Sequence, residues 1–132
     1  THMLPADRAL IAKVYGIDES VLKSFIQHLT YVRNLSAHHS RVWNRRFTIT
    51  MRLPRSKPQE LANQFQANSR YIYNTLVMIL HFMNLIAPHH SWRNRFFMLV
   101  KKYNVPLAAM GFPKDWQQRA IWQTENELVG NK

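Results

Sequence analysis

The sequence predicts an all-α domain, a bundle of four or five helices. Apolar residues recur at helical spacing in separate stretches, prolines end or divide those stretches, and the one β-rich run is only a few residues long. With 132 residues and 46% hydrophobic content, the chain is long enough to bury a single core. We therefore expect one domain over residues 4–123, with 1–3 as a tag remnant and 124–132 as a polar tail.

Two helices are predicted in the N-terminal third. The first spans Leu4–Tyr15 and ends near Gly16. The second starts after an N-cap at Asp18 or Ser20 and continues toward Trp43. Its apolar stripe consists of Leu22, Phe25, Leu29 and Val32.

The next stretch is predicted to be mostly irregular. Thr48–Met51 favours at most one small strand, and Pro54 and Pro58 mark an extended basic loop. A helix over Glu60–Ala67 follows.

The helix predicted over Ser69–Ala87 is apolar on nearly every face, which is typical of a central core helix or an oligomer interface. Its densest apolar run is too short for a membrane span and contains His81 and Asn84. A further helix is expected from Ser91 to about Tyr103. The chain then forms a short turn or helix at Leu107–Met110 and a last helix from Pro113 to Trp122.

The net charge and its distribution limit the classes of function that the chain can have. The net charge is +11, and from Ser20 to Lys114 the sole acid is Glu60, against fourteen Lys and Arg. Such a surface attracts polyanions, and nucleic acid is the foremost of these. Scarce carboxylates argue against a two-metal nuclease, and the lack of Cys excludes thiolate catalysis and Cys-based zinc sites.

The most informative stretch is Arg33-Asn34-Leu35-Ser36-Ala37-His38-His39-Ser40-Arg41-Val42-Trp43-Asn44. In a regular helix one face would carry Asn34, His38, Arg41 and Arg45, and the adjacent stripe Arg33, Ala37, Ser40 and Asn44. Arg33 and His38 would then lie about 140° apart around the axis. The two side chains would converge on one phosphate only if the helix bends or two chains pair their motifs.

This stretch resembles the Arg-x4-His signature of HEPN domains, and its longer string resembles the form found in the bacterial Abi-like (abortive infection) family. Met110-Gly111-Phe112-Pro113-x-x-Trp116 is similar to a second signature of that family, about seventy residues further on. Abi-like proteins are usually longer, with the Arg-x4-His element in their C-terminal half. We therefore expect this chain to be a C-terminal part.

The resemblance implies a HEPN-like helical bundle that pairs as a homodimer in the bacterial cytoplasm, without a membrane segment. It implies metal-independent RNA cleavage, in which the ribose 2′-OH attacks the adjacent phosphorus and no cofactor takes part. Arg33 and His38 would be catalytic, and Asn34 would orient His38 or a phosphate. RNA would be held by Arg41, Arg45, Arg46 and Asn44. A host-toxic nuclease would need restraint, by an antitoxin, a regulatory RNA or the missing N-terminal part.

Other interpretations remain open. A HEPN domain can bind RNA or a partner without cutting. The doublets His38-His39 and His89-His90 together offer four imidazoles for zinc, although no sequence feature brings them together. His39 falls on the apolar stripe, so we expect a structural role, with catalysis as the alternative. Aromatic side chains that either stack on bases or fill the core are Tyr31, Trp43 and Trp92.

Overall fold

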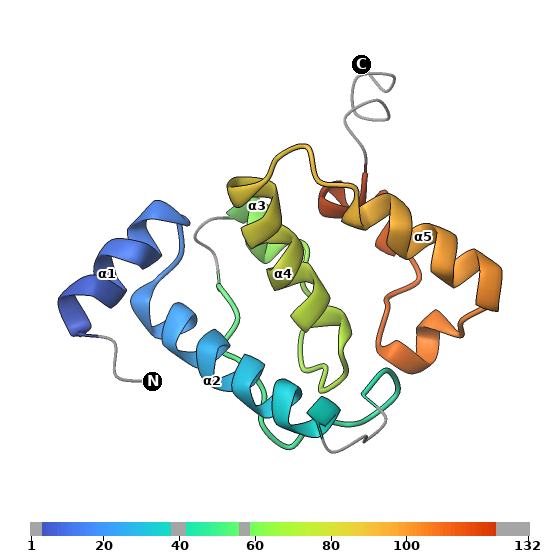
Figure 1. Ribbon diagram of the computed structural model, residues 1–132, viewed down its shortest axis with the longest axis horizontal. Coiled ribbons are helices and arrows are strands. Elements are labelled where there is room, and N and C mark those ends of the chain that lie inside the picture. The colour runs from blue at the N-terminus through green and yellow to red at the C-terminus, as the bar shows by residue number, and fades with distance from the viewer. Residues whose placement is uncertain (1–3, 38–41, 56–58, 124–132) are drawn as a thin grey trace.

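The protein is all-α, as predicted. The computed structural model describes residues 4–37, 42–55 and 59–123. Within these ranges it contains five α-helices, three short 3₁₀ helices and no strand (Figure 1).

Helices α1 (Pro5–Val14) and α2 (Glu19–Ala37) pack against each other, with α1 at one end of the molecule. Pro5 occupies the first turn of α1, where its missing N–H costs nothing. An ion pair of 3.0 Å between Arg8 Nε and Glu19 Oε1 joins the two helices. The buried face of α2 carries Val21, Leu22, Phe25 and His28.

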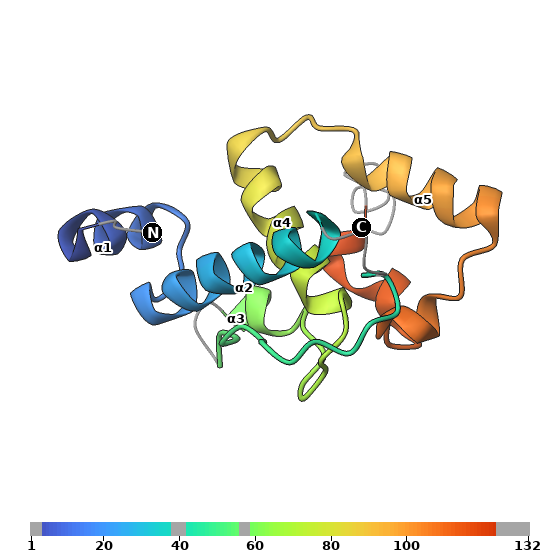
Figure 2. The same cartoon turned by 60° about the horizontal axis from the view of Figure 1, so that its bottom comes forward.

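After α2 the chain reverses and runs back along it as residues 42–55, here called the return segment (Figure 2). The hydrogen bonds define an antiparallel register. Thr48 contacts Tyr31, the Ile49 carbonyl contacts His28, and the Arg52 backbone N–H donates to Ser24. The segment is extended rather than a strand, because its partners are side chains of a helix.

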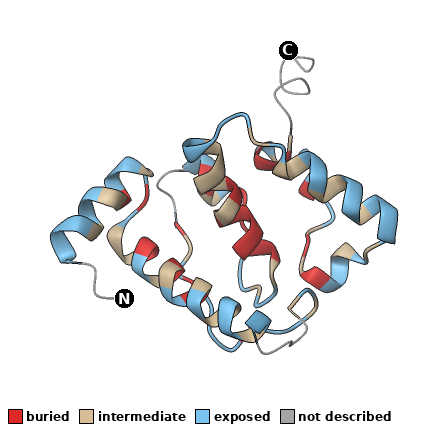
Figure 3. Ribbon diagram, in the orientation of Figure 1, coloured by how far each residue is buried: buried red, intermediate tan, exposed pale blue. Residues whose placement is uncertain are grey.

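Helix α4 (Tyr73–Ile86) lies at the centre of the fold, after the single turn of α3 (Gln59–Ala62). Figure 3 shows the buried positions concentrated on α4. Four of its side chains have no measurable exposure, namely Tyr73, Val77, Met78 and Leu80. The prediction of a central core helix is confirmed, although α4 starts four residues later than expected.

Helix α5 (Trp92–Tyr103) and the C-terminal turns enclose an aromatic cluster around Trp122, which is 1% exposed. Rings within 6.5 Å of its centroid belong to Tyr73, Trp92, Phe96, Phe97, Phe112 and Trp116. The Trp122 indole N–H donates to the Tyr73 hydroxyl, which donates to the Gln64 carbonyl. This chain of hydrogen bonds satisfies the polar atoms that the cluster buries.

The predicted last helix is wrong. Residues after Pro113 form two 3₁₀ turns, η2 (Trp116–Gln118) and η3 (Ala120–Trp122), preceded by η1 (Leu107–Met110). The Arg119 guanidinium donates to the Gln64 and Phe65 carbonyls at 3.0 and 2.8 Å. These long-range contacts, together with burial of Trp122, hold the backbone in turns that local propensity does not favour.

No helix of the described ranges is long and apolar enough to cross a membrane.

Candidate functional site

The last turns of α2 present three polar side chains at one end of the molecule. Arg33 and Asn34 are exposed, and Tyr31 is half-buried. Tyr31 and Asn34 share a face because they are three residues apart. Arg33 points about 100° from Asn34 by the helical period.

The return segment is fastened beside this end of α2 by Phe47 and Arg70. The Phe47 backbone N–H donates to the Arg70 carbonyl at 2.7 Å, and Arg70 Nη1 donates to the carbonyls of Phe47 and Thr48 at 3.3 and 3.2 Å. The Phe47 ring is 1% exposed and packs edge-on against His28 and Tyr31. One buried aromatic side chain and one arginine thus position the basic residues that precede Phe47.

His28 is a second anchor of the return segment. Its Nδ1 lies 2.9 Å from the Ile49 carbonyl, so Nδ1 carries the proton and Nε2 accepts from the Thr75 hydroxyl at 2.6 Å. Burial lowers the pKa of His28, in spite of the Ile49 hydrogen bond, which acts in the opposite direction. The imidazole is therefore neutral and structural. The sequence signal for this role was available, since His28 lies three residues after Phe25 on the apolar stripe of α2.

Tyr31 is an accessible hydroxyl with an unusual environment. Its oxygen accepts from both the backbone N–H and the side-chain hydroxyl of Thr48, each at 3.1 Å. Those hydrogen bonds lower the pKa of the Tyr31 phenol, and the charge of Arg45 lowers it further. Because Thr48 supplies donors only, the Tyr31 proton remains available for a hydrogen bond to a ligand.

The helix predicted to continue toward Trp43 does not do so. Helix α2 ends at Ala37, Trp43 and Asn44 form a turn, and Arg45 and Arg46 belong to the extended return segment. The expected stripes that placed Arg45 in line with Asn34, and Asn44 in line with Arg33, are wrong. Phe47 is the physical reason, because the chain must turn back for Phe47 to reach the core.

Arg45 nevertheless lies beside the α2 face predicted for it, since its charge acts on the Tyr31 hydroxyl. Arg45 and Arg46 are exposed, and Asn44 is half-buried. Folding back of the chain thus brings Arg45 to the last turns of α2, beside Tyr31. The remaining predicted site residues, His38, His39 and Arg41, lie outside the described residues.

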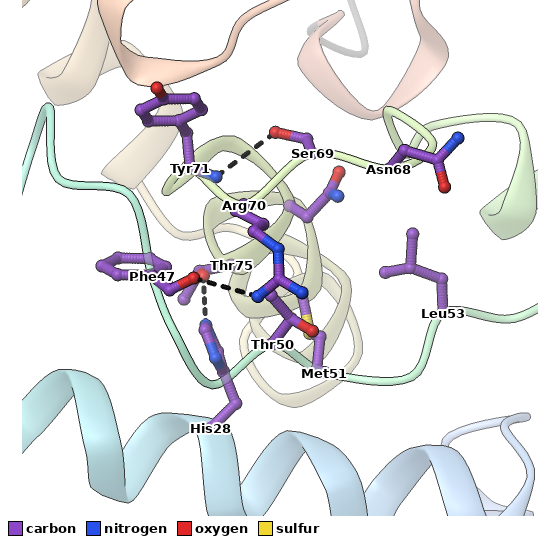
Figure 4. A pocket seen from close by; sticks show the side chains of 11 residues that line it. His28, Phe47, Thr50, Met51, Leu53, Asn68, Ser69, Arg70, Tyr71 and Thr75 are labelled. Carbon is purple, nitrogen blue, oxygen red and sulfur yellow. Dashed lines mark hydrogen bonds between the residues drawn. The ribbon is translucent and has the colours of Figure 1, made fainter.

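A pocket of about 320 Å³ opens next to this region, between the return segment and residues 68–71 (Figure 4). Its floor is formed by buried side chains that are themselves hydrogen-bonded, among them His28 and Thr75. Its rim is exposed and polar, with Thr50, Asn68, Arg70 and Tyr71. Nothing in the sequence pattern pointed to this pocket, because its residues come from three separate stretches.

Gly111, which belongs to the second signature, packs against residues that line the same pocket. Gly111 has a φ of +86°, and a Cβ added there would lie 2.7 Å from Tyr71 Cβ and 3.1 Å from Ser69 Oγ. Only glycine permits both this backbone conformation and this close approach. The turn at 68–71 is therefore held between the return segment on one side and Gly111 on the other.

The zinc interpretation gains no support. His90 Nε2 donates to Asn84 Oδ1 at 2.7 Å, and its Nδ1 accepts from the Trp92 backbone N–H at 3.2 Å, so both nitrogens are engaged. Within the described ranges no three His, Asp or Glu side chains come together as a metal site.

The stacking candidates differ in exposure. Trp92 is half-buried against Phe96 and Trp122 and belongs to the core. Trp43 is 36% exposed and lines a separate apolar groove along α5.

Comparison with known proteins gives one match. Residues 1–44 match the family described as Abi-like protein, which supports a relationship to that family over a third of the chain. No curated protein and no solved structure matches the chain significantly.

Proposed function

We propose that this chain is a metal-independent endoribonuclease of the HEPN type, acting in abortive infection or another phage-defence or toxin–antitoxin system. The similarity of residues 1–44 to Abi-like proteins supports the defence setting. The observation that carries the ribonuclease assignment is the polar, cationic end of α2. There the exposed Arg33 and Asn34 share the last turns of α2 with Tyr31, and the charge of Arg45 acts on the Tyr31 hydroxyl.

The reaction needs charge stabilisation and proton transfer. The 2′-oxygen bonds to phosphorus as the bond to O5′ breaks, one proton leaves the 2′-hydroxyl, and one reaches O5′. A guanidinium such as that of Arg33 stabilises the charge that grows on the phosphate oxygens. A neutral imidazole suits the proton transfer at physiological pH, and His38 is our candidate.

RNA binding is assigned to the surrounding cations. The backbone that follows Arg45 and Arg46 is anchored at Phe47 and Thr48 by hydrogen bonds to Arg70, which supports this assignment. Arg41 and Asn44 complete the proposed contact set. Binding through phosphates predicts an affinity that falls steeply with salt.

We also propose a homodimer in which the two motifs face each other. If the helix continued regularly to residue 38, residues 33 and 38 would point about 140° apart. A second copy would then bring the missing group to the same phosphate. Exposed apolar side chains available for such an interface include Leu85, Ile86, Met98, Leu99 and Tyr103. Light scattering showing a monomer at tens of micromolar would contradict this part of the proposal.

The test is incubation of total RNA with the protein in excess EDTA. Wild type should cut, and His38→Ala should not. Arg95→Ala is the matched control, because Arg95 is an exposed arginine on α5, away from the end of α2. If wild type binds RNA with normal salt dependence but leaves every RNA intact, the chain is instead a non-catalytic RNA-binding HEPN domain.

A further inference from the structure

The pocket beside the end of α2 has no role in the chemistry described above. It shares Phe47 with the return segment that carries Arg45 and Arg46, so it adjoins the proposed RNA-binding residues. Its volume of about 320 Å³ is at the lower end of small-ligand pockets. A ligand of this pocket is therefore small, and it binds next to the residues proposed to hold the RNA phosphates.

The walls of the pocket are suited to a flat ring. In Figure 4 the flat face of the Arg70 guanidinium is turned toward the viewer and the Leu53 side chain lies beyond its edge, with Thr50 and Met51 below them. An arginine plane and an aliphatic side chain are surfaces on which a nucleobase stacks. A phosphate alone would use the charge of Arg70 but not the apolar wall at Leu53.

Arg70 is preorganised for this role. Its Nη1 is occupied by the Phe47 and Thr48 carbonyls, which fixes the plane of the guanidinium. Its Nε and Nη2 hydrogen-bond to none of the described residues and remain able to donate. The flat face of the Arg70 guanidinium therefore stays exposed, and the side chain keeps its positive charge.

The opposite edge of the pocket is equally rigid. The Ser69 hydroxyl accepts from the Tyr71 backbone N–H, and Gly111 packs directly on this turn. The buried polar groups of the floor are already paired, so a ligand need not satisfy them. Such a site binds without the ordering cost that weakens a mobile loop.

We propose that this pocket binds one unpaired base of single-stranded RNA, stacked on the Arg70 guanidinium and in contact with Leu53. This inference rests on the proposed function, because it names the substrate as single-stranded and places one of its bases. Base-paired RNA would not insert a base, so duplex RNA should bind more weakly than a single strand of equal length.

The test compares two oligomers by fluorescence anisotropy in EDTA. One is an eight-residue 2′-O-methyl oligoadenylate, which cannot be cut by 2′-OH attack. The other is an abasic 2′-O-methyl chain of the same length, which keeps the phosphates. The ratio of their dissociation constants measures the contribution of the bases, and stacking of one base predicts a ratio of roughly 5 to 100.

Two variants locate this contribution. Arg70→Lys keeps the charge but loses the plane, and Leu53→Ala removes the apolar wall without touching the contacts of Arg70. Both should lower the ratio several-fold. Leu53→Ala should leave binding of the abasic chain nearly unchanged, whereas Arg70→Lys should weaken it as well, because Arg70 also anchors the backbone next to Arg45 and Arg46. Arg95→Lys is the control and should keep the wild-type ratio. Denaturation curves check that each variant is folded.

The outcomes separate the two proposals. An unchanged ratio in both Arg70→Lys and Leu53→Ala overturns the base pocket, even if RNA is cut. Equal wild-type binding of the two oligomers also overturns it and leaves a site for phosphate alone. If the ratio falls as expected but 2′-hydroxyl RNA is never cut, the base pocket stands and the ribonuclease assignment fails.

Discussion

Gly111→Ala should destabilise the protein far more than Gly16→Ala, although both glycines have a positive φ. The angles are +86° at Gly111 and +66° at Gly16. At Gly16 no described atom lies within 4 Å of an added Cβ. At Gly111 the added atom would meet Tyr71 Cβ at 2.7 Å, and Tyr71 Cβ cannot move without its backbone.

The magnitude follows from two terms. Holding an alanine in the left-handed region costs about 1–2 kcal/mol per residue, and both variants share this cost. Gly111→Ala adds an overpacking cost of about 1–3 kcal/mol, because the turn at 68–71 must shift. The free energy of unfolding should therefore fall by about 1–2 kcal/mol for Gly16→Ala and by about 2–5 kcal/mol for Gly111→Ala.

Urea denaturation followed by tryptophan fluorescence measures both values. The difference between the two variants isolates the contact of Gly111 with the turn. Equal losses in the two variants would refute the close approach of Gly111 to Tyr71, and with it the view that the second signature supports the pocket.

Four further outcomes are expected. Arg33→Ala, an exposed position, should keep its stability and lose cleavage by roughly a hundredfold or more; near wild-type turnover would remove Arg33 from the site. His38→Ala should be stable but inactive, whereas His39→Ala should mainly lower the melting temperature, and the reverse pattern would make His39 the catalytic residue. Tyr31→Phe keeps the ring against Phe47 and should weaken RNA binding and cleavage about tenfold, while unfolding shifts by about 1 kcal/mol; unchanged cleavage would exclude the hydroxyl. Lowering the pH should destabilise the fold, because the buried His28 is neutral in the folded protein and gains a proton more readily in the unfolded chain.

The pH dependence of stability follows from the burial of His28. Burial lowers its pKa in the folded protein, so the unfolded chain binds the proton more readily. The stabilising contribution of neutral His28 is complete above about pH 6.5, the ordinary value, and is lost as the pH falls toward the lowered pKa. Urea midpoints between pH 8 and 5 measure this loss. His28→Gln should be less stable and should show a shallower pH dependence, and an equal slope would contradict the assignment.

The sequence predicted the fold class and the central helix because these depend on periodic burial. The apolar residues of α4 recur on all its faces, and the structure buries half of them, namely Tyr73, Leu76, Val77, Met78 and Leu80. The end of α2 was not predictable in the same way. Residues 38–46 contain neither Pro nor Gly, so no local signal stops the helix before Trp43. Burial of Phe47 and its hydrogen bonds to Arg70 decide where the chain turns.

Some residues of the candidate site could likewise be predicted from the sequence, and others could not. Arg33, Asn34, Arg45 and Arg46 could be identified from one continuous stretch. Arg70 and Thr48 could not, because their roles arise from contacts between segments more than twenty residues apart. Tyr31 was noted only as a ring that could stack, whereas its hydroxyl, placed by Thr48, is the feature that the fold exposes.

The most direct test of the ribonuclease assignment is the chemistry of the RNA ends after incubation in excess EDTA. Attack by the 2′-oxygen predicts fragments with 2′,3′-cyclic phosphate or 3′-phosphate ends and 5′-hydroxyl ends. These fragments should be present with wild type and Arg95→Ala and absent with Arg33→Ala and His38→Ala. Fragments with 3′-hydroxyl ends, or activity that disappears with EDTA, would contradict it.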